Sequence, residues 1–449
     1  MRVLLISANK VRAPFPVYPL ALDYLAGALQ PMHTVRFLDL MHATAEEAVP
    51  DTIAEFTPDC VGISIRNIDN VEATHSMSFI EGYRDLIRIL RRATLAPLIL
   101  GGAGFTLFPT RLLKELGADY GVAGEGERLT ALLTALESGT DPRHLPGVVT
   151  PTDDYRVPQP WKGTPRRLTI PDNPLYAAYI KNGGMLNLQT KRGCPFQCIY
   201  CTYPLIEGHH LRCVDPEEVA STAKRLMELG ARYLYITDGV FNSDPDHCLA
   251  IADAFCAAGI TAPWCAFFAP LKTRDDFYRR LAKAGLTHVE FGTESLSDRM
   301  LGAYRKPFCR ADVMKAHQAS LEAGLHVAHY FLLGGPSETR QSVEETLLQV
   351  ESLDKAVFFF CCGIRIYPGT ELHAMAVSSG QLSPGADLLD PVFYHPDAIS
   401  PAEIEEIIKE RAAGRPNWVV GSGSDMTNKI MTRMYVKGHI GPLWEKLIP

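Results

Sequence analysis

The sequence lacks the long apolar and long basic runs that mark membrane-spanning and nucleic-acid-binding proteins. No apolar stretch approaches the roughly 20 residues that a helix needs to cross a bilayer. The formal net charge is −7, and without a long basic run this argues against nucleic acid or an anionic membrane as the main partner. The apolar part of the N-terminal segment is too short for a signal peptide, so this segment is expected to form a β-strand.

Cysteine is nearly absent from the first 193 residues and absent from the C-terminal region. Of the 11 cysteines, only Cys60 precedes Cys194, and none follows Cys362. An odd number of scattered cysteines favours reduced thiols over a disulfide framework, and therefore predicts a cytoplasmic protein. The 449 residues, of which 47% are hydrophobic and 21% charged, predict two or three globular domains.

An α/β domain is expected over residues 1–140, where short apolar segments alternate with stretches of helical periodicity. Strands that alternate with helices predict a doubly wound, Rossmann-like parallel sheet, which binds ligands in the loops at the carboxyl ends of its strands. The expected strands are Val3–Ser7, Thr34–Leu38, Cys60–Ile65, Ala96–Leu100 and Tyr120–Ala123. The expected helices are Leu20–Leu29, Glu46–Phe56, Thr74–Arg92, Pro109–Leu116 and Glu127–Leu136.

A second α/β domain is expected over residues 185–370, after a proline-rich segment, residues 141–184, that has the composition of a wrapping linker. Its βα units predict a partial (β/α)6 barrel of the triose-isomerase type, with its chemistry at the carboxyl ends of the strands. Residues 371–449 are expected to form a small α-rich C-terminal appendage. The expected barrel strands are Met185–Thr190, Tyr233–Thr237, Trp264–Phe268, His288–Phe291, Val327–Leu333 and Cys362–Ile366.

Three cysteines, Cys194, Cys198 and Cys201, lie close together in the loop after the first expected barrel strand. Three thiolates can bind three irons of a cubane cluster and leave the fourth iron open, whereas a cluster with four protein thiolates serves electron transfer. The alternatives are three unrelated buried thiols or a zinc site short of a fourth ligand. This spacing, with Tyr200 just before the last cysteine, resembles the signature of the radical S-adenosylmethionine enzymes.

That resemblance implies a [4Fe–4S] cluster whose open iron is chelated by S-adenosylmethionine, and it extends through further barrel loops. Tyr200 stands where the family has an aromatic residue that contacts the adenine. Asp238 stands where the family receives the ammonium group of the cosubstrate, although a helix N-cap is a competing role. Glu294 and Ser295 match the family's Gly-x-Glu-Ser, whose carboxylate accepts hydrogen bonds from the ribose hydroxyls.

Two more positions complete the resemblance in the barrel. Lys306 falls where the family has a cation facing the methionine carboxylate, with Arg305 as the competing residue and a solvated surface pair as the alternative. The loop that contains Gly334, Gly335 and Pro336 resembles the family's glycine-rich loop. Glycines there let the backbone approach a flat ligand closely, because no Cβ intervenes.

Three loops at the expected carboxyl ends of the first domain resemble the cobalamin-binding domain that is fused to many radical S-adenosylmethionine enzymes. Their small residues would form a shelf for a corrin ring; a generic nucleotide-binding sheet or simple tight turns are the alternatives. The sequence does not contain the Asp-x-His-x-x-Gly motif whose histidine ligates cobalt in another class of cobalamin proteins. The residues that carry this resemblance are Ser64, Arg66, Asn67, Gly101, Gly102, Phe105, Glu125, Gly126 and Glu127.

Arg66 is expected at the tip of the third strand, beneath the corrin. Its guanidinium stays protonated and cannot ligate cobalt. An unligated lower face would favour the cob(I)alamin nucleophile and ease release of the methyl group. Pairing of Arg66 with Asp69 or with a phosphate is the alternative. Arg66 and Tyr200 are the two residues expected to be catalytic.

The two resemblances together imply a cobalamin-dependent radical S-adenosylmethionine enzyme, most simply a methyltransferase acting on an unactivated carbon. One S-adenosylmethionine would methylate cob(I)alamin, and a second would give the 5′-deoxyadenosyl radical that abstracts a substrate hydrogen. The alternatives are ring contraction, cyclisation or rearrangement without methyl transfer, and a non-catalytic cobalamin or iron–sulfur sensor or carrier. The expected partners are a small-molecule or lipid-precursor substrate and an external electron donor such as flavodoxin or ferredoxin.

Overall fold

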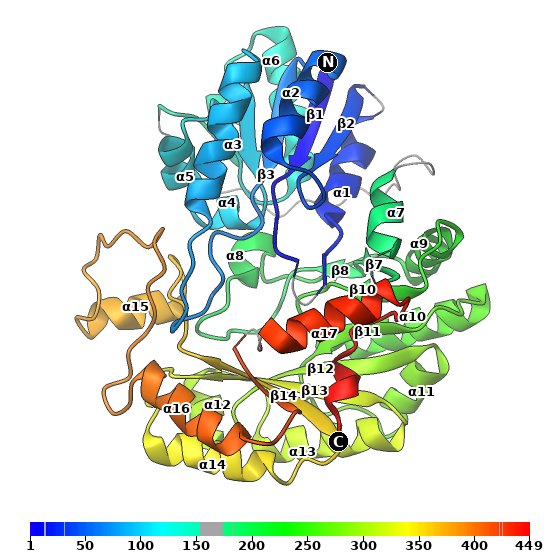
Figure 1. The fold of residues 1–449 in the computed structure, drawn as a ribbon, viewed down its shortest axis with the longest axis vertical. Helices are drawn as coiled ribbons and strands as arrows, with labels where there is room; N and C mark the ends of the chain where they lie inside the picture. The colour runs from blue at the N-terminus through cyan, green and yellow to red at the C-terminus, as the bar shows by residue number, and fades with distance from the viewer. Residues whose placement is uncertain (13–14, 31, 153–173, 182, 422, 424) are drawn as a thin grey trace.

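The computed structural model describes residues 1–12, 15–30, 32–152, 174–181, 183–421, 423 and 425–449. Two mainly parallel sheets, each with its own helices, are stacked along the long axis of the molecule, with the N-terminal sheet uppermost (Figure 1). This arrangement confirms the expected α/β class, with a doubly wound domain followed by a partial barrel. No helix within the ranges given above is long and apolar enough to cross a membrane.

The N-terminal sheet has the strand order β2-β1-β3-β4-β5-β6, in which only β6 runs antiparallel to its neighbour. Val3 and Leu5 of β1 pack with α1 and α6, whereas Leu4 and Ile6 pack with α2, α3 and α5 on the other face. Its central strands are therefore apolar throughout, because helices cover both faces. The strands are β1 Arg2–Ser7, β2 Thr34–Asp39, β3 Cys60–Ser64, β4 Leu98–Gly101, β5 Tyr120–Val122 and β6 Val148–Val149. The helices are α1 Leu20–Leu29, α2 Ala45–Phe56, α3 Ile80–Ala93, α4 Ala103–Leu107, α5 Pro109–Leu116 and α6 Leu129–Ser138, with 3-10 turns η1 Gly126–Arg128 and η2 Pro142–His144.

The structure differs from the sequence expectation in two parts of this half. The helix expected from Thr74 begins only at Ile80, because residues 66–79 form a long loop that is held by a bridge between Asp69 and Ser78. The proline-rich segment contributes β6 to the sheet and the helix α7 Pro174–Lys181, so it does more than link. Residues 153–173 of that expected linker lie outside the described residues.

The second sheet is parallel throughout, in the order β15-β14-β13-β12-β11-β10-β7. Helices α9 to α14 cover its outer face, and several begin at an acidic or hydroxyl residue that caps the first turn, such as Asp215, Asp244 and Thr339. The strands are β7 Met185–Leu188, β10 Tyr233–Ile236, β11 Trp264–Phe268, β12 Leu286–Glu294, β13 His326–Leu333, β14 Ala356–Cys362 and β15 Trp418–Val420. The helices are α9 Pro216–Glu228, α10 Pro245–Ala258, α11 Phe277–Lys283, α12 Asp298–Ala303, α13 Arg310–Glu322, α14 Arg340–Val350, α15 Glu371–Ser378, α16 Pro401–Ala412 and α17 Asp425–Val436, with the 3-10 turns η3 Phe241–Ser243 and η4 Trp444–Leu447.

Two strands of this sheet were placed wrongly or missed in the sequence analysis. The expected strand Cys362–Ile366 is in fact β14, which ends at Cys362, because the apolar run that starts at Ala356 pairs with β13. Beyond it the chain turns, and Arg365 bridges to Phe393. The C-terminal region is not only helical, since β15 adds a seventh strand through the pair Phe358 and Trp418.

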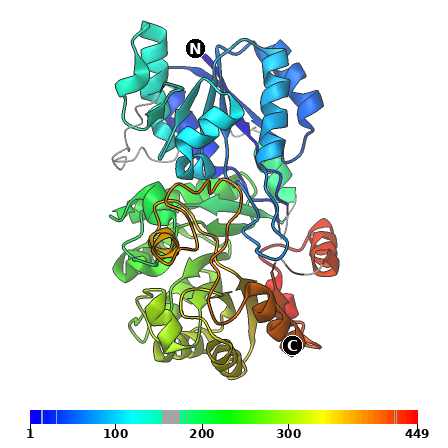
Figure 2. The same cartoon turned by 90° about the vertical axis from the view of Figure 1, so that its left-hand side faces the viewer.

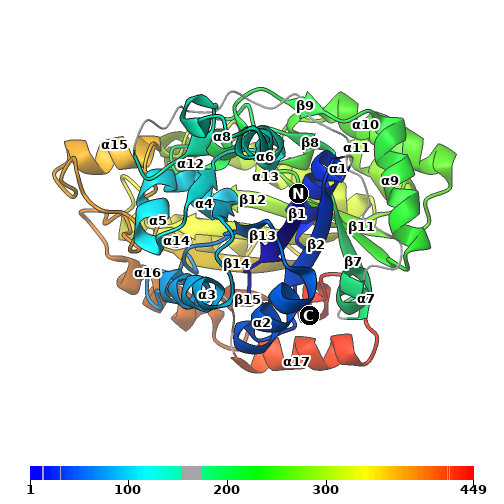
Figure 3. The same cartoon turned by 90° about the horizontal axis from the view of Figure 1, so that it is seen from above.

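The carboxyl ends of the two sheets face each other. Asp69 follows β3 and Arg365 follows β14, and their side chains form a fully buried ion pair of 3.0 Å. The loop that carries Asp69 also presses Ala73 against Gly363 of the barrel. It can be followed from the upper domain down to the lower one in Figure 2. Seen from above, β1 and β2 overlie the barrel strands β12 to β14 (Figure 3).

Candidate functional site

The loops of both sheets meet in the space between the domains. Besides the pair of Asp69 and Arg365, the Nη2 of Arg192 lies 2.8 Å from Oε1 of Glu127. Arg192 follows the first barrel strand and Glu127 follows the last parallel strand of the N-terminal sheet. Both fold types bind their ligands at the carboxyl ends of the strands, so the two expected sites share one interdomain region.

The cysteine loop is closed by a short two-stranded ladder. Strand β8 Lys191–Arg192 pairs antiparallel with β9 Arg212–Cys213, and the loop between them includes the short helix α8 Tyr203–Glu207. Gly193 begins the loop with φ +90°, and a Cβ on it would lie 2.2 Å from the carbonyl oxygen of His210. Only glycine fits there, so the loop's entry is fixed by its backbone.

The three cysteines of this loop are reduced and partly or fully buried. Burial, with smaller contributions from the neighbouring thiols of Cys198 and Cys194, raises the pKa of the Cys201 thiol to about 12. Adjacent thiolates are therefore unfavourable unless a bound metal compensates their charge. Within the described ranges no three His, Cys, Asp or Glu side chains converge on a single ion. A cubane cluster does not need such convergence, since it binds each thiolate through a different iron, so this donor set fits a cluster better than zinc.

A hydrogen-bonded triad stands beside the cysteine loop. Oε1 of Glu294 accepts hydrogen bonds from the Tyr200 hydroxyl (2.8 Å) and from Nζ of Lys306 (3.0 Å). The ammonium group also lies 3.3 Å from the Tyr200 hydroxyl. Oε2 of Glu294 has no partner among the residues that the structure describes. Arg305, the competing residue for Lys306, pairs at the surface with Glu371 instead.

The Glu294 backbone explains why these groups meet. Glu294 has φ +62°, a conformation that side-chain-bearing residues rarely adopt, at the point where the β12–β13 register shifts. This kink turns the carboxylate toward the cysteine loop. Burial works against the charge of Lys306, but Glu294 and the neighbouring Cys198 thiol raise the pKa of its ammonium group overall. The triad therefore carries one fixed cation beside the cluster cysteines.

Asp238 does not have the role that the family resemblance implied. It is buried, and its Oδ1 accepts hydrogen bonds from the backbone N–H groups of Thr190 (2.7 Å) and Lys191 (3.3 Å). Its Oδ2 accepts from the Thr190 hydroxyl and from Nζ of Lys191 (3.0 Å). These four bonds use the lone-pair sites of the carboxylate, so none is left for a ligand ammonium group. Asp238 is not the N-cap of a helix either; it anchors the start of the cysteine loop.

Ser295 and the glycine-rich loop are also engaged by the protein. The fully buried Ser295 hydroxyl bonds Thr346 at 2.9 Å. The backbone N–H of Gly335 donates to the Tyr304 hydroxyl (3.2 Å), and a Cβ on Gly335 would lie 2.3 Å from the Tyr304 ring. The Tyr304 ring in turn meets the Tyr200 ring edge to face, with centroids 6.0 Å apart. The loop with Gly334, Gly335 and Pro336, all buried, thus supports Tyr200 from behind.

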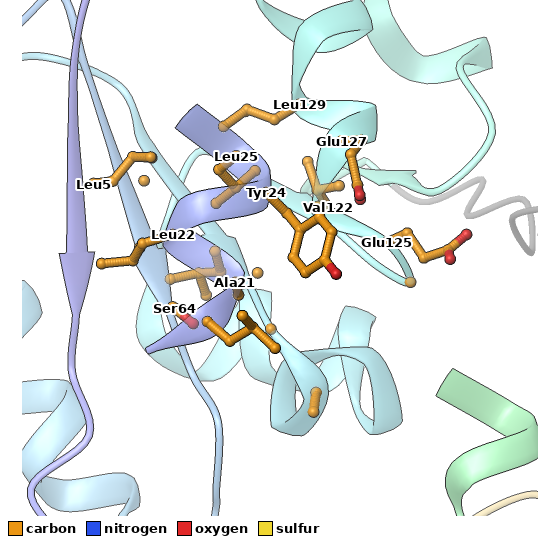
Figure 4. Close-up of a pocket in the computed structure, with 18 of the residues that line it drawn as sticks. Leu5, Ala21, Leu22, Tyr24, Leu25, Ser64, Val122, Glu125, Glu127 and Leu129 are labelled. Atoms are coloured by element: carbon orange, nitrogen blue, oxygen red, sulfur yellow. The ribbon is translucent and has the colours of Figure 1, made fainter. Parts of the chain in front are cut away.

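A largely apolar pocket lies in the N-terminal domain, between α1 and the carboxyl-terminal half of the sheet (Figure 4). It encloses about 1000 Å³ of empty space, including the part open to solvent. Its apolar wall includes Leu5, Leu22, Leu25, Val122 and Leu129, and Glu125 and Glu127 stand at its polar rim. The pocket reaches the cysteine loop, because Gln189, Arg192, Ile206 and Glu207 also line it. Of the residues expected to bind a cofactor here, Ser64, Gly101, Gly102, Glu125, Gly126 and Glu127 line this pocket.

Phe105 is the exception in that group. Its side chain, on α4, is completely buried and packs against Gly121 of β5, where a Cβ would come within 2.1 Å of the ring. A residue in that position contacts no ligand, so the expectation for Phe105 was wrong. Gly121 and the ring of Phe105 pack against each other. From the sequence alone, an aromatic residue that packs in this way cannot be told from one that contacts a ligand.

The two acidic residues at the pocket rim hold the domains together. Arg192 lies 3.1 Å from Oε1 of Glu125 and 2.8 Å from Oε1 of Glu127, and Arg212 also pairs with Glu125. All four side chains are largely buried. The guanidinium of Arg192 also covers the Tyr24 ring of α1, 4.3 Å from its centroid. Sequence reasoning missed both arginines, although Arg192, only two positions before the cluster cysteine Cys194, was a usable signal.

Arg66 lies on the wall of the interdomain space. Solvent reaches its side chain, yet surrounding protein desolvates it enough to lower the pKa of the guanidinium. Asp69 is occupied by Arg365, so the expected alternative of an Arg66–Asp69 pair is not formed. In the described part of the chain, Arg66 makes no hydrogen bond or ion pair. Asn67, beside it, accepts a bond from the Tyr83 hydroxyl through its backbone oxygen (2.6 Å).

Comparison with known proteins identifies both halves of the chain. Residues 188–350 match the Radical SAM superfamily, and residues 6–133 match the B12 binding domain. The tryptophan 2-C-methyltransferase of Streptomyces laurentii is 26% identical over 438 residues, which span 82% of this chain and 73% of that protein.

Two solved structures of the radical S-adenosylmethionine methyltransferase TsrM from Kitasatospora setae have the same fold. One, with tryptophan substrate and a S-adenosylmethionine analogue bound, superposes with a TM-score of 0.87 at 23% identity and covers 99% of this chain and 97% of that one. The other, with cobalamin and a [4Fe–4S] cluster bound, gives 0.76 at 26% identity and covers 90% of this chain and 84% of that one. With a B12 binding domain set over a radical SAM barrel, this chain belongs to the cobalamin-binding radical S-adenosylmethionine enzymes.

Proposed function

We propose that this protein is a cobalamin-dependent radical S-adenosylmethionine methyltransferase that methylates an unactivated carbon of a small molecule. The observation that carries the proposal is the shared pocket, whose wall is formed jointly by the loops of the B12 binding domain and by Gln189, Arg192, Ile206 and Glu207 around the cysteine loop. Methyl transfer between two cofactors requires that their sites adjoin. The methyltransferase relatives named above are consistent with this arrangement.

The residues present fit all three cofactors. Cys194, Cys198 and Cys201 would hold three irons of a [4Fe–4S] cluster, and the triad around Glu294 would face S-adenosylmethionine bound to the fourth. The apolar pocket beneath Ser64, Gly101, Gly102 and Gly126 is wide enough to take part of a cobalamin. When bound, these groups supply a reducing electron, a cleavable sulfonium and a transferable methyl group.

The chain's own residues orient and screen this chemistry. Oε2 of Glu294 would accept a hydrogen bond from a ribose hydroxyl, and Lys306, held by Glu294 at 3.0 Å, would supply the positive charge for the methionine carboxylate. Tyr200 is positioned by both of these groups and by the ring of Tyr304. Arg66 is an unpaired cation on the wall of the interdomain space, and a guanidinium there cannot ligate cobalt. These side chains favour binding and exclusion of water rather than proton transfer.

The proposal also covers the substrate, the electron donor and the location of the protein. A small-molecule or lipid-precursor substrate fits the enclosed position of the site, and an external donor such as flavodoxin or ferredoxin would supply the electron. An oxygen-labile cluster held by reduced cysteines fits a cytoplasmic location.

Transfer of an isotopic label tests the proposal without knowledge of the substrate. The protein would be loaded anaerobically with iron, sulfide and cobalamin, then given a reductant and S-adenosylmethionine with a deuterated methyl group. We expect trideuteromethyl-cobalamin in the mass spectrum of the extracted cofactor, and 5′-deoxyadenosine as a second product. Retention of cobalamin without any label would exclude methyl transfer and favour a rearrangement. Lys306→Met should lower the yields of label and of 5′-deoxyadenosine, and Arg305→Met, altered only at a surface ion pair, is its matched control.

A further inference from the structure

Half-buried aromatic side chains line the inside of the barrel at one level. Ring centroids are 5.9 Å apart between Phe15 and Tyr235, and 6.1 Å apart between Tyr235 and Phe267. The series continues from Phe267 to Tyr330 at 5.5 Å and from Tyr330 to Phe359 at 4.7 Å, where the rings stack. These rings come from β10, β11, β13 and β14, and Phe15 reaches in from the N-terminal domain. They form one continuous aromatic wall that solvent still reaches.

Glu290 of β12 interrupts this wall with a carboxylate. Its register partner on β11 is Phe267, so it lies at the level of the rings. Only 3% of the residue is exposed. Its Oε2 accepts hydrogen bonds from the hydroxyls of Tyr235 (3.0 Å) and Tyr330 (3.3 Å), and its Oε1 accepts one from Nε1 of Trp444 (2.9 Å).

Among the described residues this buried carboxylate has no fixed cation beside it, because the nearby His288 pairs with Glu445 instead (3.4 Å). All three of its hydrogen-bond donors are neutral, and within the described ranges no Lys or Arg side chain forms an ion pair with Glu290. Burial raises the pKa of the Glu290 carboxyl, and the three donors together with His288 only partly oppose this. The buried carboxylates Asp69, Glu127 and Asp238 each have a basic partner. In the described part of the chain, Asp39 and Glu338 have none but each accept a backbone N–H, from Met41 and Gly334, whereas Glu290 is held by side-chain donors alone. A buried carboxylate without a cation is costly, which marks a place where a ligand can supply one.

From these observations we infer that the barrel interior binds the protonated amine of an aromatic small molecule, with the amine against Glu290 and the ring against the aromatic wall. Aromatic faces combined with a carboxylate are the usual means by which proteins bind organic cations. The site adjoins the proposed cosubstrate site, because Glu290 and Glu294 lie four residues apart on the same strand, β12. The inference rests on the proposed function only in that it names the class of substrate.

Three indoles of equal ring structure and different charge test this inference by direct binding. Tryptamine carries an ammonium group, 3-methylindole is neutral, and indole-3-propionate is an anion. Their affinities would be measured by calorimetry on the anaerobic protein loaded with cluster and cobalamin. We expect tryptamine to bind at least about tenfold more tightly than 3-methylindole, and indole-3-propionate not to bind. Equal affinities of the three compounds for the unmodified protein would overturn the inference without any variant.

Substitution locates the interaction. Glu290→Gln keeps the shape of the side chain and should abolish the preference for tryptamine over 3-methylindole. Glu445→Gln is the matched control, because Glu445 is a neighbouring, largely buried carboxylate that pairs with His288 instead (3.4 Å), and the preference should survive in it. If Glu290→Gln does not fold, Tyr330→Phe removes one donor of the same carboxylate and should still change the tryptamine affinity. Tyr278→Phe, in the helix α11 that packs on the outer face of the sheet, should not. Survival of the preference in Glu290→Gln would refute the assignment.

Competition separates this site from the cosubstrate site. Tryptamine should bind with unchanged affinity when S-adenosylhomocysteine is present in excess. Displacement by S-adenosylhomocysteine would mean that the amine occupies the cosubstrate site, and would overturn the inference. These binding measurements do not depend on turnover, so a failure of methyl transfer would not change them. Conversely, a loss of amine binding would not affect the labelling of cobalamin, so the two proposals can fail separately.

Discussion

The buried ion pairs of Arg192 should hold the two cofactor domains together. Arg192 contacts Glu127 at 2.8 Å and Glu125 at 3.1 Å, and only 14% of its side chain is exposed. The variant Arg192→Met keeps the apolar stem that lies over Tyr24 but removes the charge. Glu127 would then be a buried carboxylate without its partner, whereas Glu125 keeps Arg212. Breaking one side of a buried pair costs 3–5 kcal/mol, and the retained Arg212 puts the expectation near the lower limit, at about 3 kcal/mol.

Urea unfolding followed by circular dichroism measures this loss as a lower midpoint at an unchanged slope. The double variant Arg192→Met, Glu127→Gln should recover much of the stability, because it removes the uncompensated charge as well. The surface variant Arg305→Met, whose pair with Glu371 is half exposed, should be indistinguishable from the unmodified protein. A loss below about 1 kcal/mol for Arg192→Met, or simple additivity in the double variant, would refute the reasoning.

Three further outcomes are expected. Glu294→Gln should weaken binding of S-adenosylmethionine about tenfold or more, measured by equilibrium dialysis, because it replaces a charged acceptor that also orients Lys306; unchanged affinity would contradict the proposed cosubstrate site. Burial lowers the pKa of His317 to about 4, below the unfolded value near 6.5, so the unfolded chain binds a proton that the folded chain does not. His317 should therefore contribute a fall in unfolding free energy of up to about 1.4 kcal/mol per pH unit as the pH falls from 6.5 toward 4. His329, whose pKa burial also lowers, adds a slope of the same sign, so His317→Asn should make the profile shallower rather than flat, and an unchanged slope would contradict the assignment. Gly335→Ala should lower the unfolding free energy by about 1–3 kcal/mol and shift the near-ultraviolet signal of the tyrosines, because its Cβ would lie 2.3 Å from the Tyr304 ring; a silent substitution would show that the loop does not support Tyr200.

The sequence predicted the parts of the fold that depend on strong local patterns. Alternating apolar segments and helical stretches placed most strands within a few residues, and α1 and α5 agree with the structure at both ends. The strand β15 has only three residues and depends on its pairing with Phe358, which no local pattern reveals. The shift of β14 arose because the apolar character continues past Cys362 to Ile366, so the end of the strand is set by the tertiary contacts of Arg365.

In the site, the spacing of the motifs along the sequence identified which residues gather. It did not show which of their polar atoms remain free to bind a ligand. Tyr200, Glu294 and Lys306 meet beside the cysteine loop, and the roles that the resemblance implied for them toward the cosubstrate stay predictions. Asp238 was assigned to a ligand because the sequence does not show that Lys191 and Thr190 use its oxygens. Glu290 was overlooked, although a carboxylate within the apolar strand His288–Phe291 was the one signal of an unusual interior. For both Asp238 and Glu290, the hydrogen-bond partners come from residues distant in the sequence, and only the folded structure shows which residues these are.

The central claim is that one chain holds a cluster and a cobalamin side by side. Anaerobic reconstitution with iron, sulfide and hydroxocobalamin, followed by desalting and metal analysis, tests it most directly. We predict about four irons and one cobalt per chain, with the irons lost in Cys201→Ala while the cobalt is retained. Four irons without retained cobalt would contradict the claim, since the pocket beneath Gly101 and Gly126 would then serve another ligand.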